Sequence, residues 1–311
     1  MTLIDSAEYF LQSGVRISTP LLLAALGELI AEKSGLINIG LEGKVLAGAF
    51  AGFMTVALTH SLGLGVCAAM MAGILLAFLF GLMCITLRND QIVTGAALNF
   101  LAIGITGFMY KTFFGTTGST TTISPFQELP IPMLRDIPVI GPMLFSHTLL
   151  TYLAIALAVL IMVVNRRTRL GFHLSAVGEQ PRAADAAGIP VNRVRWIAIL
   201  IEGLLGGLAG ASLSLSLSNT FNEEMSNGRG YIALAIVIFG RWNPFGVFGA
   251  ALLFGTATAI QLLLQAGNIP WMKQNYPYLQ MLPYLLTLII LVFAAGRSHA
   301  PAALGRHYHR E

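Results

Sequence analysis

Long runs of apolar residues, separated by short polar stretches, extend along almost the whole chain. A helix needs roughly 20 apolar residues to cross a bilayer. Candidate spans lie near residues 15–31, 36–58, 62–87, 92–114, 147–164, 196–218, 230–242, 246–266 and 280–296. The first and seventh are short or interrupted, which favours half-helices or re-entrant elements. The pattern predicts an all-α, polytopic membrane protein with about eight to ten transmembrane helices, some of them short or broken.

The composition supports a membrane protein. Hydrophobic residues make up 56% of the chain and charged residues only 10%, and the mean hydropathy is +0.75. A soluble domain carries about 25% charged residues, so this chain has too few charges to cover a water-facing surface. Its longest polar segments reach only about thirty residues, and we therefore expect one transmembrane domain over residues 1–311.

The basic residues are concentrated in a few connections. Loop 165–195 carries six arginines, and the C-terminal tail carries Arg297, Arg306 and Arg310. Because short basic loops stay in the cytoplasm, loop 165–195 and the C-terminus are predicted to be cytoplasmic. The Thr- and Pro-rich loop 115–146 then lies on the extracytoplasmic side, and an odd number of spans would place the N-terminus there too.

The stretch EKSGLINIGLEGKVLAG (32–48) combines charges and glycines in apolar surroundings. A P-loop requires Gly, four residues, and then Gly-Lys-Ser/Thr. Here Val45 follows Gly43 and Lys44, and Asn38 occupies the position of the first glycine. No Gly-Lys-Ser/Thr occurs elsewhere in the sequence. If ATP drives this protein, another subunit must supply the ATPase.

Glu42 and Lys44 begin an otherwise apolar helix. An isolated charge at the bilayer centre costs about 3 kcal/mol, so each needs the interface, a partner or water. One interpretation is a helix that starts at the interface, with Lys44 reaching to water and Glu42 near the positive helix end. The other places Asn38 and Glu42 at a break beside a solute pathway.

Two further polar residues interrupt apolar spans. Glu202 has no obvious partner in its own helix, so it should face other helices or a cavity. It is either hydrogen-bonded inside the protein or part of a gate. Asn99 either forms an interhelical hydrogen bond or contacts the substrate. The candidate pathway residues are therefore Asn38, Glu42, Asn99 and Glu202.

Glycines recur in two Gly-rich blocks, one in each half of the chain. The blocks GLINIGLEGKVLAGAFAGF and GRGYIALAIVIFGRWNPFGVFGAALLFG indicate a possible internal repeat, as found in many transporters. In run 196–218, Gly203 with Gly207 and Gly206 with Gly210 form small-xxx-small pairs. These pairs predict close packing between helix backbones.

The polar segment SAVGEQPRAADAAGIPVNRVRW (175–196) predicts a short helix. Pro181 suits its first turn, the alanines that follow favour helix, and Gly188 with Pro190 gives a stop signal. The segment is either a passive connector on the membrane surface or a helix that docks into a groove of a soluble partner, and its small alanine-rich face favours docking.

No arrangement of residues predicts catalysis or metal binding. Cys67 and Cys84 lie in one apolar run and are expected to be small buried side chains. The histidines lack metal-ligand spacing, and the spans contain no Ser/His, paired-Asp or zinc-type arrangement. We therefore expect no catalytic residue, no metal site and no cofactor in this chain.

Three blocks in order resemble a known family: EKSGLINIGLEG, AVGEQPRAADAAGI and SNGRGYIALAIVIFGRWNPFGVFGAALLFG. They resemble permease subunits of bacterial ABC importers for branched-chain amino acids, ribose and nucleosides. The resemblance runs from about residue 15 to 296 and is greatest to the nucleoside branch, whose members work with a basic-membrane-protein-type lipoprotein.

The resemblance implies an alternating-access transporter in the bacterial plasma (inner) membrane. Its other parts would be a homologous, non-identical permease, a cytoplasmic ABC ATPase that binds ATP and Mg, and a substrate-binding lipoprotein or periplasmic protein; no nucleic acid is expected. A ribose-type sugar or branched-chain amino acid permease and a stand-alone secondary transporter are the alternatives. The residues implied in coupling to the ATPase are Gly178, Glu179, Pro181, Arg182, Ala183, Ala184 and Gly188.

Overall fold

The computed structural model describes residues 3–115, 121–135, 137, 140–266 and 300–309, with isolated positions between 278 and 292. The described part is predominantly helical. In chain order its elements are α1 (Leu3–Lys33), α2 (Leu41–Thr59), α3 (Leu62–Gly81), η1 (Leu82–Thr86), α4 (Gln91–Phe114), β1 (Glu128–Pro130), α5 (Ile140–Phe145), β2 (Ser146–Thr148), α6 (Leu149–Arg167), α7 (Arg169–Glu179), α8 (Pro181–Ala186), α9 (Val191–Ser212), η2 (Leu213–Leu217), α10 (Arg229–Phe239) and α11 (Pro244–Ala266).

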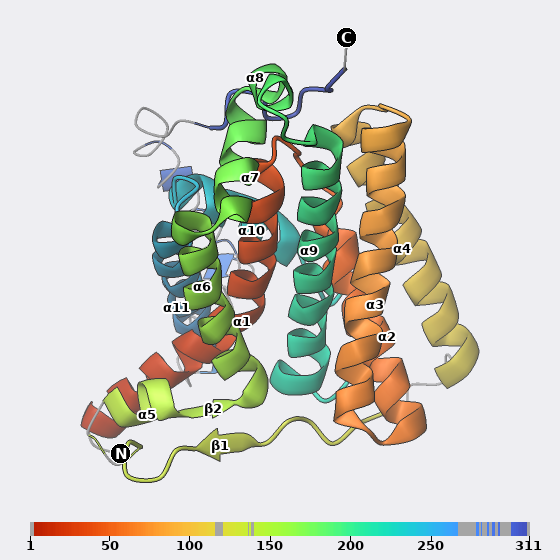
Figure 1. Cartoon of the computed structure of the whole chain (residues 1–311). Coiled ribbons are helices and arrows are strands. Elements are labelled where there is room, and N and C mark those ends of the chain that lie inside the picture. The colour runs from red at the N-terminus through yellow and green to blue at the C-terminus, as the bar shows by residue number, and fades with distance from the viewer. Residues whose placement is uncertain are drawn as a thin grey trace.

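The long helices lie side by side and form a bundle (Figure 1). Helix α1 packs against α9, α10 and α11, while α9 also packs against α2 and α3. Helix α8 and the C-terminal tail lie at one end of the bundle, and β1, β2 and α5 lie at the other (Figure 1). The two polar regions of the protein are therefore at opposite ends.

Seven of the described helices are long and apolar enough to cross a bilayer: α1, α2, α3 continued by η1, α4, α6, α9 continued by η2, and α11. The prediction that the seventh run forms a short helix is confirmed, because α10 has only 11 residues. The prediction that the first run forms a short or interrupted helix is wrong, because α1 has 31 residues. The helix extends beyond the apolar run into the polar residues before it, where Gln12 donates a hydrogen bond to the backbone of β2. The predicted span 280–296 lies outside the continuously described residues.

The all-α prediction is confirmed, with one small addition: β1 lies inside the predicted loop 115–146, and β2 lies where the predicted span 147–164 was expected to begin. Strands β1 and β2 pair antiparallel, and Leu129 lies opposite His147. Each strand has three residues, so the local sequence offered too short a pattern to predict a strand.

The small-residue pairs of run 196–218 bring helix backbones together, as predicted. A Cβ placed on Gly48 of α2 would lie 2.5 Å from the carbonyl oxygen of Gly207. One turn earlier in α9, a Cβ on Gly73 of α3 would collide with the carbonyl oxygen of Gly203. Helix α9 is therefore held between α2 and α3 at backbone contact distance.

Two helices begin inside the bundle rather than at its ends. Leu41, the first residue of α2, lies beside Gly206, which is roughly 22 Å along α9 from Val191 at 1.5 Å per residue. The predicted span 36–58 is thus helical only from Leu41. Residues 36–40, inside the bundle, are not helical. Helix α10 starts at the same level, because Gly230 packs on Glu42.

Candidate functional site

A buried ion pair joins α2 to α9 halfway through the bundle. The Lys44 ammonium contacts Oε2 of Glu202, and both side chains are 0% exposed. Nδ2 of Asn38 donates to Glu202 Oε1 at 3.0 Å, and the Asn38 backbone N–H donates to Oε1 of Glu28 at 3.2 Å. Both carboxylate oxygens of Glu202 are thereby occupied. Asn38 and Glu202 hold the break before α2 in shape.

Two further acids belong to this buried region and were missed by the sequence analysis. Glu28 lies against Asn38, and its second oxygen has no hydrogen-bond partner among the described residues. Glu32, one turn later in α1, accepts a hydrogen bond from the Trp242 indole at 2.5 Å. The available signal was their i, i+4 spacing, which places both carboxyl groups on one face of α1.

Glu42 caps the start of α10 from a distant part of the chain. Its Oε1 accepts from the Gly228 backbone N–H at 2.8 Å, and its Oε2 accepts from the Gly230 N–H at 2.6 Å. The first N–H groups of a helix have no partners within the helix and carry partial positive charge, so a carboxylate is stabilised there. Glu42 therefore lies in the first turn of α2 but bonds to the start of α10. The interpretation in which α2 starts at the interface with Lys44 reaching to water is wrong, because Lys44 is fully buried in its ion pair with Glu202.

Asn99 of α4 connects three segments. Its Oδ1 accepts from the Gly43 N–H at 2.7 Å, and its Nδ2 donates to the Ile39 carbonyl and to the Tyr231 hydroxyl, both at 2.9 Å. The predicted interhelical hydrogen bond is confirmed. Asn99 fixes α4 against both the start of α2 and the first turn of α10.

A cavity of about 720 Å³ lies beside the first turns of α2 and α10. Among the four candidate pathway residues, Glu42 and Asn99 line it, whereas Asn38 and Glu202 do not. The loop between η2 and α10 forms most of its wall. The cavity is lined by Glu42, Gly43, Leu46, Asn99, Ile103, Ser218, Asn222, Glu223, Glu224, Met225, Ser226, Asn227, Gly228, Arg229 and Tyr231.

The lining of this cavity combines polar and apolar groups, and most of its residues are uncharged. It offers carboxylate, amide and hydroxyl groups together with the half-exposed ring of Tyr231. Of its charged groups, Glu223 is paired with Lys111 at 3.1 Å, and both oxygens of Glu42 are occupied by backbone N–H groups. The site is suited to a neutral, hydroxyl-bearing solute with a flat face.

At the opposite end of the bundle, α8 confirms the predicted short helix between Pro181 and Gly188. Arg182 and Ala183 are exposed, but Ala184 is buried against the bundle. Gly178 is also buried, because the last turn of α7 packs on the Lys33 carbonyl. The outward face of this segment therefore excludes two of the residues expected to contact a partner.

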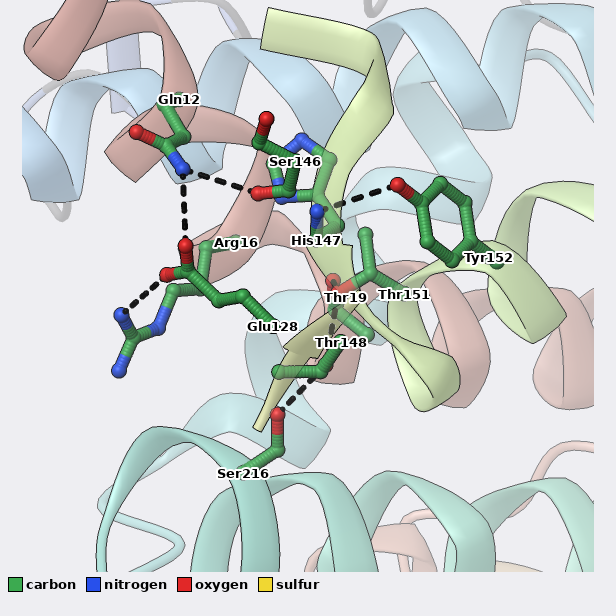
Figure 2. A network of polar contacts seen from close by, with 10 residues as sticks. All are labelled: Gln12, Arg16, Thr19, Glu128, Ser146, His147, Thr148, Thr151, Tyr152 and Ser216. Atoms are coloured by element: carbon green, nitrogen blue, oxygen red, sulfur yellow. Dashed lines mark hydrogen bonds and ion pairs between the residues drawn. The ribbon is translucent and has the colours of Figure 1, made fainter. Parts of the chain in front are cut away.

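The β1–β2 ribbon is anchored to the first turns of α1, as Figure 2 shows. Gln12 donates to the Ser146 carbonyl at 2.9 Å and to a Glu128 carboxylate oxygen at 3.4 Å. Arg16 forms an ion pair with Glu128 at 3.5 Å. These contacts attach the long loop 115–146 to the bundle.

Strand β2 is also bonded to two other elements (Figure 2). The Thr148 hydroxyl lies 2.8 Å from the Ser216 hydroxyl of η2 and 3.4 Å from the Thr151 hydroxyl of α6. Thr151 in turn accepts a hydrogen bond from Thr19 of α1 at 3.0 Å. His147 is almost fully buried, and its Nε2 lies 2.6 Å from the Met143 carbonyl. Burial lowers the pKa of His147 below its ordinary value.

Comparison with known proteins decides the family. Residues 10–294 match the family described as branched-chain amino acid transport system / permease component. The chain belongs to this permease family. The permease is accordingly a multi-pass membrane protein, in agreement with its seven long apolar helices.

Relatives of the permease cover nearly its whole length. It is 39% identical over 94% of its chain to the guanosine ABC transporter permease protein NupQ of Bacillus subtilis, covering 93% of that protein. It is 35% identical to the nucleoside ABC transporter permease protein NupC of Lactococcus lactis, over 99% of each chain. It is also 35% identical, over 97% of each chain, to a putative glucose ABC transporter permease protein, TsgC13, of Haloferax volcanii.

Proposed function

We propose that the permease is the transmembrane subunit of a bacterial ABC importer for nucleosides. It would lie in the plasma (inner) membrane with α8 and the C-terminus in the cytoplasm, as the positive charge of these segments favours. The observation that carries the proposal is the cavity at the starts of α2 and α10, whose lining suits a nucleoside. The names of NupQ and NupC support the same substrate class.

A nucleoside has ribose hydroxyl groups and a flat base. Carboxylate and amide oxygens in the cavity wall can accept hydrogen bonds from hydroxyl groups, while Leu46, Ile103 and the Tyr231 ring offer apolar faces for the base. The volume of about 720 Å³ lies within the range usual for small-ligand sites, roughly 300–1,000 Å³. Glu42 and Asn99, the two candidate pathway residues that line the cavity, would then be the ones that contact the solute.

The permease would work with a second, homologous and non-identical permease subunit, an ABC ATPase and a substrate-binding lipoprotein. ATP and Mg would be bound by the ATPase, which would dock on the exposed face of α8 through Arg182, Ala183 and their neighbours. The binding lipoprotein would deliver solute at the opposite end, where the β1–β2 ribbon lies. ATP-driven movement of α8 would then open and close the cavity in alternation.

Uptake by the reconstituted transporter tests this proposal. The permease, its partner permease, the ATPase and the lipoprotein are placed in liposomes, and uptake of labelled guanosine, ribose, glucose and leucine is measured. Guanosine uptake that requires ATP and excludes the other three solutes is expected. Uptake that continues with a hydrolysis-deficient ATPase would instead identify a stand-alone transporter.

A sugar is the second candidate substrate. The Haloferax volcanii relative carries a glucose-transport name, and the hydroxyl and carboxylate groups of the cavity also suit a polyol. ATP-dependent uptake of glucose or ribose in the same liposomes, with no uptake of guanosine, would replace the nucleoside assignment and leave the ABC permease assignment in place.

A further inference from the structure

The tail 300–309 returns to the end of the bundle where α8 lies (Figure 1). The Ala303 N–H donates to the Gly178 carbonyl at 2.8 Å, and the Ala302 N–H donates to the Glu179 carboxylate at 3.3 Å. Two residues later, the Gly305 N–H donates to the Gly35 carbonyl at 3.0 Å. The tail therefore bonds on one side to the end of α7 and on the other to the turn after α1.

Arg195 of α9 bonds both to the turn after α1 and to the tail, and the place where they meet the end of α7 is here called the junction. Its Nε donates to the Ser34 carbonyl at 3.2 Å, and its Nη1 donates to the Arg306 carbonyl at 3.0 Å. The Arg195 side chain is 3% exposed. Its Nη2 has no hydrogen-bond partner among the described residues. Because burying a guanidinium is costly, the two bonds that Arg195 makes to separate loops indicate that these loops are held in a defined arrangement.

Gly35 shows how close the fit is. Its φ is +87°, a conformation that other residues rarely adopt, and an added Cβ would lie 3.0 Å from the Arg195 guanidinium and 3.1 Å from the Ala303 carbonyl oxygen. Ala303 itself is buried. The tail is thus packed into the junction and does not merely cover it.

The turn at Gly35 leads directly to the cavity. Asn38, three residues later, bonds to Glu202 and Glu28, and Glu42 caps α10 in the cavity wall. On its other side the tail holds the residues that immediately precede α8. Hydrogen bonds and short chain segments therefore connect the corner between α7 and α8, through the tail, to the starts of α2 and α10.

We propose that residues 300–309, here called the C-terminal strap, are a coupling element of the permease. The strap holds the α7–α8 corner and the turn at Gly35 together, so that a displacement of α8 is passed to the break before α2. Arg195 is the positioning residue that secures the strap. The inference rests on the proposed function in one respect, namely that a partner ATPase moves α8.

The first experiment measures ATP hydrolysis and guanosine uptake by the complete reconstituted complex. Arg195→Lys keeps the charge but cannot bond to both carbonyl groups in the same way, and uptake per ATP hydrolysed should fall about tenfold. Arg306→Ala is the matched control, because Arg306 contributes its backbone carbonyl and its side chain is exposed. An unchanged ratio in Arg195→Lys together with an unchanged ratio in a variant lacking residues 300–311 would overturn the proposal.

A cross-link tests the strap even if those variants fail to assemble. Glu179→Cys and Ala302→Cys, both exposed positions in contact, are joined by a short bifunctional thiol reagent in a background with Cys67→Ser and Cys84→Ser. If the corner and strap move as one unit, the cross-linked complex keeps its uptake per ATP. Loss of uptake on cross-linking, with hydrolysis retained and uptake restored by cleaving the linker, would overturn the proposal, because the strap would then have to separate from the corner during transport. ATP-independent uptake by the unmodified complex would contradict the proposed function instead.

Discussion

Lys44 and Glu202 form an ion pair in the middle of the bundle, where neither side chain has any contact with solvent. One charge comes from the start of α2 and the other from the middle of α9, and Asn38 completes the hydrogen bonding of the carboxylate. The pair fixes the depth at which α2 begins. The cavity and its capped helix start depend on that depth.

Removing the charge of Glu202 should strongly destabilise the permease. In Glu202→Gln the Lys44 ammonium remains buried without its ion-pair partner, and breaking a buried pair in this way costs about 3–5 kcal/mol. We expect a much lower midpoint of thermal unfolding in detergent. The midpoint is measured with a dye that becomes fluorescent when it reacts with a thiol, as the buried Cys84 becomes accessible on unfolding.

Glu28 provides the matched control for that variant. Its Oε1 accepts one backbone hydrogen bond and its Oε2 has no described partner, so Glu28→Gln keeps the acceptor and adds no unpaired charge. The unfolding midpoint of Glu28→Gln should stay close to that of the wild type. Equal destabilisation by both substitutions would contradict the assignment of Glu202 as the partner of Lys44.

Loss of the Glu42 carboxylate should loosen the start of α10. Glu42→Ala leaves the Gly228 and Gly230 N–H groups without this acceptor, and each unsatisfied buried group costs about 1–3 kcal/mol. We expect faster amide hydrogen exchange in the first turn of α10 and reduced guanosine uptake. Glu42→Gln retains one acceptor oxygen and should give an intermediate result; exchange as slow as in the wild type for both variants would argue against the capping role.

The Tyr231 ring is predicted to contribute to nucleoside affinity. Stacking of a base on an aromatic ring is worth about 1–3 kcal/mol. Tyr231→Ala should therefore raise the KM for guanosine uptake by roughly 5–150-fold. Tyr231→Phe keeps the ring and removes only the hydroxyl that accepts from Asn99. A similar KM change in both variants would assign the effect to the Asn99 hydrogen bond.

Adjacent alanines in α8 should respond differently to the same substitution. Ala183 is exposed and Ala184 is buried, so Ala183→Glu should permit folding but uncouple ATP hydrolysis from uptake. Ala184→Glu buries an unpaired carboxylate and should lower the yield of folded protein. Hydrolysis, uptake and detergent-extracted yield, measured together, separate these outcomes. Normal uptake by Ala183→Glu would place the ATPase contact elsewhere.

His147 should make the stability of the permease depend on pH. Burial lowers its pKa in the folded protein, so the unfolded chain binds more protons once the pH falls below the ordinary value of about 6.5. The free energy of unfolding should therefore decrease from pH 8 to pH 5. His147→Gln can still donate to the Met143 carbonyl but does not titrate, and its unfolding midpoint should vary less over the same range. Identical pH dependence in both proteins would exclude His147 as the cause.

Local patterns were sufficient for much of the architecture. Apolar run length predicted the long helices, Pro181 and Gly188 predicted α8, and the glycines around Gly207 predicted close helix packing. These features depend on residues within a few turns of one another, where helix periodicity and backbone preferences act. The sequence also showed that Asn38, Glu42, Asn99 and Glu202 needed partners, because polar groups inside a membrane must be satisfied.

Only the tertiary structure decided which partners they have. Glu42 bonds to the N-cap of α10, 186 residues later, Lys44 pairs with an acid 158 residues away, and Arg195 secures a tail 111 residues further along the chain. No spacing rule connects such positions, since their proximity results from the packing of whole helices. The sequence by itself determined that this is a multi-pass membrane protein containing buried charges, and the packing of α2, α9 and α10 decided which of those charges line the cavity and which support it.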